Sequence, residues 1–264
     1  SSYYGTKFSY RILLKIVLNF LSLYKRKILY KLKKKINIDN LSLNFKSLEE
    51  NFSYFGTDKA NIWNNGKLKG HGFSEYYEKH LNYLKNKKIN ILEIGSYSGA
   101  SAASFSKYFP NANIFCLDVN ISKFKFCSKN IKVFDLDVSV NNSKEKFLKQ
   151  SKIDTQNTCF DIIIDDGSHI LSDILKCFNN YFTLIKPGGF YIIEDYKHPN
   201  YYNHLNDVED ILVDDLIKKI INKEHFKSNF FNQLNQDNIF KKIKNIDTYK
   251  GNLKDSNIVF FEMN

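Results

Sequence analysis

Two pairs of acidic residues carry the clearest chemical signal in the sequence. Asp165 and Asp166 follow one short apolar run, and Glu194 and Asp195 follow the next. If both runs are neighbouring parallel strands about 4.8 Å apart, these carboxylates converge at one edge of a sheet. Converging carboxylates repel one another, and a divalent cation removes that penalty. Oxygen ligands favour Mg²⁺, Ca²⁺ or Mn²⁺, so we predict a metal site here; separately solvated loop acids are the alternative.

A histidine follows the first acidic pair closely. His169 lies three residues after Asp166. Histidine can accept a proton near neutral pH, and a hydroxyl held by a cation is easier to deprotonate. We therefore predict that His169 is a general base, with His198 as the second candidate. The remaining histidines are expected to be surface or packing residues: His71, His80, His204 and His225.

A glycine-containing loop after the apolar run 89–94 predicts a nucleoside site. A dinucleotide loop would read GxGxxG, whereas here Gly95 and Gly99 are separated by three residues and Tyr97 replaces the middle glycine. The loop resembles motif I of the class I S-adenosylmethionine-dependent methyltransferases. That resemblance implies that Asp118, which ends the next strand, accepts hydrogen bonds from the ribose hydroxyls. The alternative is a structural glycine turn in another doubly wound protein. The expected cofactor-binding residues are Glu93, Gly95, Ser96, Gly99, Asp118 and Asp137.

Further motifs narrow the resemblance. They are Phe55-Gly56-Thr57-Asp58-Lys59, His71-Gly72-Phe73, Tyr76-Tyr77-Glu78, Ile164-Asp165-Asp166-Gly167-Ser168-His169, Lys186-Pro187-Gly188-Gly189 and Ile192-Ile193-Glu194-Asp195-Tyr196. Through these motifs the chain is similar over residues 55–198 to the metal-dependent sugar O-methyltransferases of macrolide and bacterial polysaccharide pathways. The similarity implies that Mg²⁺ is bound by Asp166, Glu194 and Asp195 and that His169 is the base. Asp165 is the rival ligand if the register is shifted by one residue.

The implied reaction is transfer of a methyl group from S-adenosylmethionine to a sugar hydroxyl. The expected acceptor is a nucleotide-activated sugar or a polysaccharide precursor. A catechol or phenol acceptor uses the same metal chemistry and stays open, as does a non-catalytic binding protein with this fold. Base methylation of nucleic acid is disfavoured, because Asp165 to Ser168 stand where an Asn/Asp-Pro-Pro-Tyr-like tetrapeptide is expected.

Strand-like and helix-like segments alternate through most of the chain. This alternation predicts an α/β fold: a doubly wound, Rossmann-like sheet of seven strands with the last strand antiparallel. The domain is expected to span residues 51–264. The expected strands are 89–94, 113–117, 132–136, 160–164, 190–193, 243–249 and 258–262, and the expected helices include 100–108 and 207–221.

Residues 1–50 form a basic arm that we expect to be helical. Of the net charge of +11 carried by 264 residues, this arm holds +8, from eleven basic and three acidic residues. Its apolar stretch 12–24 is too short to span about 30 Å of hydrocarbon. The arm therefore packs on the body or on a second subunit, lies on an anionic membrane, or contacts nucleic acid. Four cysteines without a paired spacing, and no signal-peptide pattern, predict a cytoplasmic protein, peripheral at the inner membrane face if the arm binds lipid.

Overall fold

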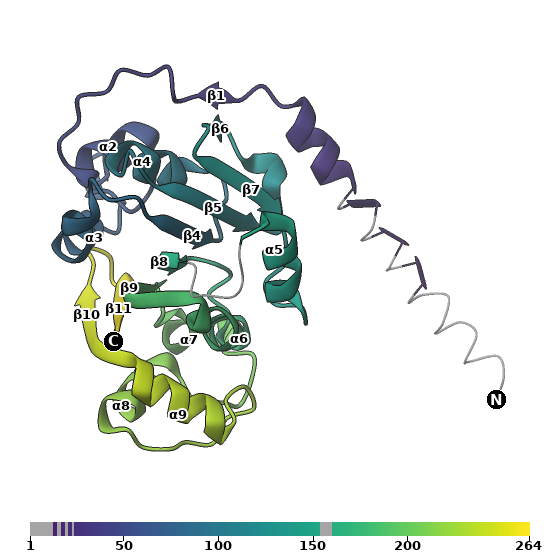
Figure 1. Ribbon diagram of the computed structural model, residues 1–264, viewed down its shortest axis with the longest axis vertical. Helices are drawn as coiled ribbons and strands as arrows, with labels where there is room; N and C mark the ends of the chain where they lie inside the picture. The colour runs from purple at the N-terminus through teal and green to yellow at the C-terminus, as the bar shows by residue number, and fades with distance from the viewer. Residues whose placement is uncertain (1–12, 15–16, 19–20, 23, 154–159) are drawn as a thin grey trace.

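A seven-stranded sheet forms the centre of the computed structural model, which describes residues 13–14, 17–18, 21–22, 24–153 and 160–264 (Figure 1). The strand order is β10-β11-β9-β8-β4-β5-β7. The strands from β7 to β9 are parallel, and β11 is antiparallel to both of its neighbours. This is the predicted doubly wound sheet. Its strands are β4 (Asn90–Ile94), β5 (Asn113–Asp118), β7 (Ile131–Asp135), β8 (Phe160–Asp165), β9 (Ile185–Glu194), β10 (Ile243–Lys250) and β11 (Asn257–Met263).

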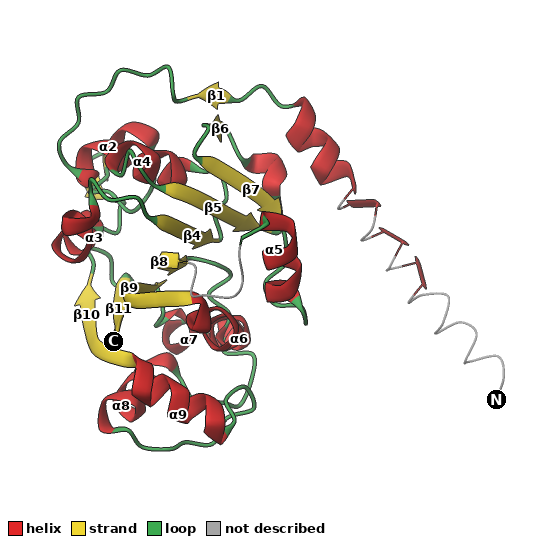
Figure 2. Cartoon of the chain, in the orientation of Figure 1, coloured by secondary structure: helices red, strands yellow, loops and turns green. Residues whose placement is uncertain are grey.

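Helices cover both faces of the sheet, and each face has its own hydrophobic core (Figure 2). Ile163 of β8 packs into one core, whereas Ile162 and Ile164 pack into the other. A strand buried on both faces needs apolar residues at successive positions, which explains the continuous run in β8. One core includes α5 (Ser143–Ser151), α6 (Leu171–Tyr181), α8 (Val213–Asn222) and α9 (Gln233–Lys242), and the other includes α2 (Leu48–Phe55), α3 (Ser74–Leu81) and α4 (Ala100–Tyr108).

Short elements complete the chain. The strand β1 (Ile36–Asn37) pairs with β6 (Phe126–Cys127) and ties the arm to the body. Two further strands, β2 (Trp63–Asn64) and β3 (Lys67–Leu68), form a hairpin after α2. The remaining helical turns are η1 (Asn82–Leu84), η2 (Ile121–Lys123), η3 (Phe182–Leu184), α7 (His198–Tyr201) and η4 (Asn203–Leu205).

Some predicted boundaries were wrong. The helix expected at 207–221 begins only at Val213, because the Asp207 carboxylate accepts hydrogen bonds from the backbone and hydroxyl of Ser172 at the start of α6. Lys186 to Gly189 lie within the bounds of β9, where its register against β8 is irregular and Gly188 has a positive φ of 71°. The expected arm boundary at residue 50 falls inside α2, which packs on α4. Part of the apolar stretch 12–24 lies outside the described residues.

Candidate active site

A cavity of about 660 Å³ opens at the carboxyl ends of the parallel strands. One end is lined by the loops that follow β5 and β7, including Asp118 and Asp137. The other end is lined by Asp166, on the loop after β8, and by Lys59, on the loop after α2. The turn that carries Gly95 lies along the same cavity. The topology thus brings five separate chain segments to one site.

Gly95 is required by a close approach between two loops. Its φ is +85°, and a Cβ atom at this position would lie 1.9 Å from the backbone oxygen of Asp166. Its amide also donates to the carbonyl of Leu117 on β5. A side chain here would therefore push the β8 loop, with its acidic residues, away from the cavity.

The predicted cofactor residues divide into two groups. Gly95, Ser96, Asp118 and Asp137 line the cavity, whereas Glu93 and Gly99 do not. Glu93 is buried behind the wall, where Ser101 donates to its carboxylate and where burial raises its pKa.

The Asp118 carboxylate is held in place by the backbone. Its two oxygens accept hydrogen bonds from the amides of Tyr97 (2.7 Å) and Asn120 (2.6 Å). Each carboxylate oxygen can accept a second hydrogen bond. Asp118 can therefore still receive two donors from a ligand in the cavity.

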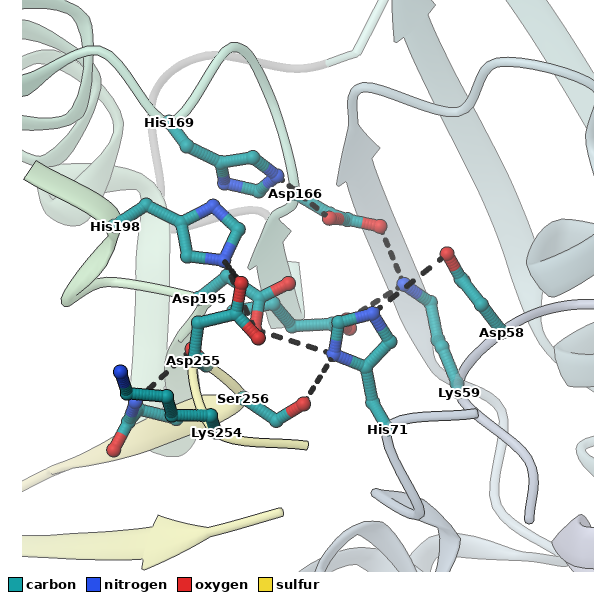
Figure 3. A network of polar contacts seen from close by, with 12 residues as sticks. Asp58, Lys59, His71, Asp166, His169, Asp195, His198, Lys254, Asp255 and Ser256 are labelled. Carbon is teal, nitrogen blue, oxygen red and sulfur yellow. Dashed lines mark hydrogen bonds and ion pairs between the residues drawn. The ribbon is translucent and has the colours of Figure 1, made fainter. Parts of the chain in front are cut away.

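Lys59 is the residue that sequence reasoning missed. Its ammonium group lies 2.5 Å from Asp166 Oδ2 and 2.7 Å from Glu194 Oε2, and the residue is only 1% exposed (Figure 3). The Tyr77 hydroxyl donates to the other oxygen of Glu194 at 2.5 Å. Burial would lower the pKa of Lys59, but the two carboxylates raise it well above its ordinary value. Lys59 thus supplies a positive charge inside the acidic cluster. In the sequence, Lys59 was marked only as part of the family motif at 55–59.

We expect Lys59→Met to destabilise the fold by about 3–5 kcal/mol, because Asp166 and Glu194 would lose their buried counter-charge. Urea denaturation measures this. The matched control is Lys186→Met, which breaks a more exposed pair with Asp161 and should cost about 1 kcal/mol or less. Equal losses in the two variants would contradict the role assigned to Lys59.

Asp195 faces histidines rather than Lys59. Its Oδ1 lies 3.4 Å from His71 Nδ1 and 3.9 Å from His198 Nε2, yet this buried atom accepts no well-formed hydrogen bond among the described residues. Burial would lower the pKa of His71, but Asp195 raises it to about 9. His71 was expected to be a surface or packing residue; it packs on Phe73 and also contacts the predicted metal ligand Asp195, which the sequence did not predict.

The two candidate bases lie side by side. The rings of His169 and His198 are 4.8 Å apart, and His169 Nε2 lies 3.7 Å from Asp166 Oδ1. Burial lowers the pKa of His198.

One ligand atom each from His169, Asp195 and His198 lies within 4.8 Å of the others, a spacing that a metal ion could bridge. His169 and Asp195 both have positive φ, 57° and 52°, which marks a backbone held in place by its surroundings.

Asp165 points away from this cluster. It is buried near Cys177 of α6, and burial raises its pKa to about 7. Successive residues at a strand end face opposite sides, so Asp165 and Asp166 cannot both join the Lys59 cluster. Of the two candidate ligands, only Asp166 therefore belongs to the acidic cluster around Lys59.

Comparisons with known proteins agree with this architecture. A family model described as "Methyltransferase domain" matches residues 85–254. Mycinamicin VI 2''-O-methyltransferase of Micromonospora griseorubida is 31% identical over 132 residues, which is 47% of this chain and 31% of that protein. L-olivosyl-oleandolide 3-O-methyltransferase of Streptomyces antibioticus is also 31% identical over 132 residues, 47% of this chain and 32% of that protein. The chain thus spans about a third of the length of these relatives.

A solved structure supports the fold. It is described as the MycE methyltransferase from the mycinamycin biosynthetic pathway in complex with Mg, SAH and mycinamycin VI. The superposition has a TM-score of 0.62 at 23% identity and covers 83% of this chain and 55% of that one.

Proposed function

The chain belongs to the methyltransferase-domain family, and we propose that it transfers a methyl group from S-adenosylmethionine to a sugar hydroxyl with the help of a divalent cation. One observation carries this proposal. A single cavity is lined both by a carboxylate suited to a ribose, Asp118, and by Asp166, whose other oxygen lies 3.7 Å from His169 behind the lining. The names of the relatives, which are sugar-directed O-methyltransferases, support the same acceptor class. Within this class, we propose that the acceptor is a nucleotide-activated sugar or a polysaccharide precursor.

The cofactor end of the cavity suits an uncharged nucleoside. Asp118 has two oxygens that can accept the ribose hydroxyls, and no phosphate-binding glycine loop is present at 95–99. Asp137 lines the same end and is fixed by hydrogen bonds from Ser139. When bound, S-adenosylmethionine supplies an electrophilic methyl group on a sulfonium.

Carboxylates from two strand ends supply the oxygen atoms that a divalent cation prefers, and among the described residues only His169, Asp195 and His198 already bring ligand atoms within 4.8 Å of one another. We propose that Asp166, Glu194 and Asp195 hold Mg²⁺, and the buried Oδ1 of Asp195, which lacks a hydrogen bond, supports this. Both oxygens of Glu194 already contact Lys59 or Tyr77, so Glu194 would bind through its remaining lone pairs. The alternative donor set combines Asp195 with two imidazoles, which suit transition metals better than Mg²⁺.

The chain's own residues then perform two tasks. His169 accepts the proton of the acceptor hydroxyl at an imidazole nitrogen, and Asp166 lies close enough to orient that ring. The walls of the cavity align the acceptor oxygen with the methyl carbon, so that the new C–O bond forms as the C–S bond breaks. The bonding electrons stay on sulfur. A bound cation would make the hydroxyl more acidic.

The test is methyl transfer with the full chain, S-adenosylmethionine and Mg²⁺ over three acceptor classes. Nucleotide-activated sugars and sugar glycosides should gain one methyl group by mass spectrometry, with matching formation of S-adenosylhomocysteine. Methylation of a catechol alone would favour the rival acceptor class. Cofactor binding without transfer to any acceptor would favour the non-catalytic alternative.

We expect Asp118→Asn to weaken cofactor binding by roughly 10- to 150-fold, because the amide loses the charge that strengthens a ribose hydrogen bond worth about 1.5–3 kcal/mol. Calorimetry with S-adenosylhomocysteine measures this. The control is Asp237→Asn on α9, which removes a carboxylate that pairs with His225. This variant should bind S-adenosylhomocysteine with normal affinity. Unchanged affinity in Asp118→Asn would remove Asp118 from the cofactor site.

A further inference from the structure

Apolar side chains are exposed along the helical residues of the basic arm, of which the structure describes 13–14, 17–18, 21–22 and 24–32. Most of them are separated by three or four positions or form adjacent pairs at that spacing, so they share one broad face of a helix. Their exposed fractions run from 40% at Ile28 to 78% at Leu32. The stripe consists of Leu13, Leu14, Val17, Leu18, Leu21, Tyr24, Ile28, Leu29 and Leu32.

The opposite face of this helix contacts the body. Arg26 donates to the carbonyl of Val119 at 2.9 Å, and Lys33 donates to the carbonyls of Ser122 and Lys123. The half-buried ring of Tyr30 packs against the hydrophobic core on the same side. Of the arrangements left open for the arm, packing on the body is seen for these residues, but the basic face expected to be solvated makes the contacts. The polar face contacts the body, and the apolar side chains of the stripe are exposed. Figure 1 shows the arm running outward from the body toward the N-terminus.

Charge identifies what could cover this stripe. Residues 1–38 contain ten Lys or Arg and no acidic residue. Lys25, Lys31 and Lys34 are exposed on this helix and its end. A second copy would bring an equally basic arm against the first, and nucleic acid would leave the apolar side chains in water. An anionic bilayer satisfies both features, because acyl chains cover the stripe and headgroups attract the lysines.

We propose that this arm docks the protein on an anionic lipid surface, with the helix lying in the plane of the interface. Val119, which receives the hydrogen bond from Arg26, also lines the cofactor cavity. The docked arm therefore holds the cavity beside the lipid surface. This inference is independent of the methyl acceptor proposed above.

Vesicle sedimentation with the full chain tests the proposal. Vesicles of neutral phosphatidylcholine are compared with vesicles in which a third of the lipid is phosphatidylglycerol. We expect binding to the anionic vesicles that weakens as salt shortens the Debye length. Replacing Lys25, Lys31 and Lys34 with Gln should weaken binding by about 10²-fold, since each lysine near the surface contributes about five-fold.

Two variants test whether binding depends on the stripe itself or on any exposed apolar side chain. Leu18→Asp with Leu21→Asp should abolish vesicle binding, whereas Leu234→Asp on α9, which is 69% exposed, should leave it unchanged. Cofactor affinity and circular dichroism should be normal in all variants. Absence of binding to anionic vesicles would overturn the proposal. So would a dimer in light scattering that dissociates in the stripe variant, because a second copy would then cover the stripe.

Discussion

Replacing His169 with alanine is expected to lower turnover by about 10²- to 10⁴-fold, the usual contribution of a general base. S-adenosylhomocysteine should bind normally, because its proposed contacts lie at the Asp118 end of the cavity. Raising the pH should restore part of the rate, since hydroxide can then remove the proton from the acceptor. Steady-state kinetics across pH, with a saturating acceptor, measure both effects.

His198 provides the matched control, because its ring lies only 4.8 Å from that of His169. His198→Ala should reduce turnover far less and should show no rescue at high pH. His204→Ala, on the 3₁₀ turn after α7, should have no effect. A normal rate for His169→Ala together with a large loss for His198→Ala would reassign the base to His198.

Metal removal is expected to have the second large effect. A chelator should abolish transfer, and Mg²⁺ or Mn²⁺ should restore it. Loss of a residue that only hydrogen-bonds to a metal ligand lowers metal affinity by about 10- to 100-fold. Asp195→Asn should weaken metal binding by more than this, because its buried Oδ1 is itself a proposed ligand atom. Calorimetric titration with Mn²⁺ measures the affinity without requiring turnover.

The ligand set can be resolved with two further variants. Glu194→Gln should weaken Mn²⁺ binding if three carboxylates hold the metal, whereas His198→Ala should weaken it if the two imidazoles do. Asp247→Asn on β10 is the control and should bind Mn²⁺ normally. Full activity in the presence of a chelator would refute the metal proposal altogether.

The sequence alone determined where the site lies. Short apolar runs ending in acids predict buried parallel strands, and the carboxyl ends of such strands must share one edge of the sheet. For this reason Asp118, Asp166, Glu194 and Asp195 could all be placed at one edge of the sheet before any contact was known, and two of them, Asp118 and Asp166, line the cavity there. Gly95 and Gly99 could be identified as a turn from their spacing, because few other residues adopt positive φ readily.

Only the tertiary structure decided which side chains face one another. Lys59 reaches Asp166 across more than a hundred residues, and His71 reaches Asp195 from a loop before α3. Such pairings depend on how helices and loops pack above the sheet, which no local periodicity encodes. The same holds for the arm. The sequence predicted that it is helical, but only the contact between Arg26 and Val119 showed which side faces the body, with the apolar side chains exposed.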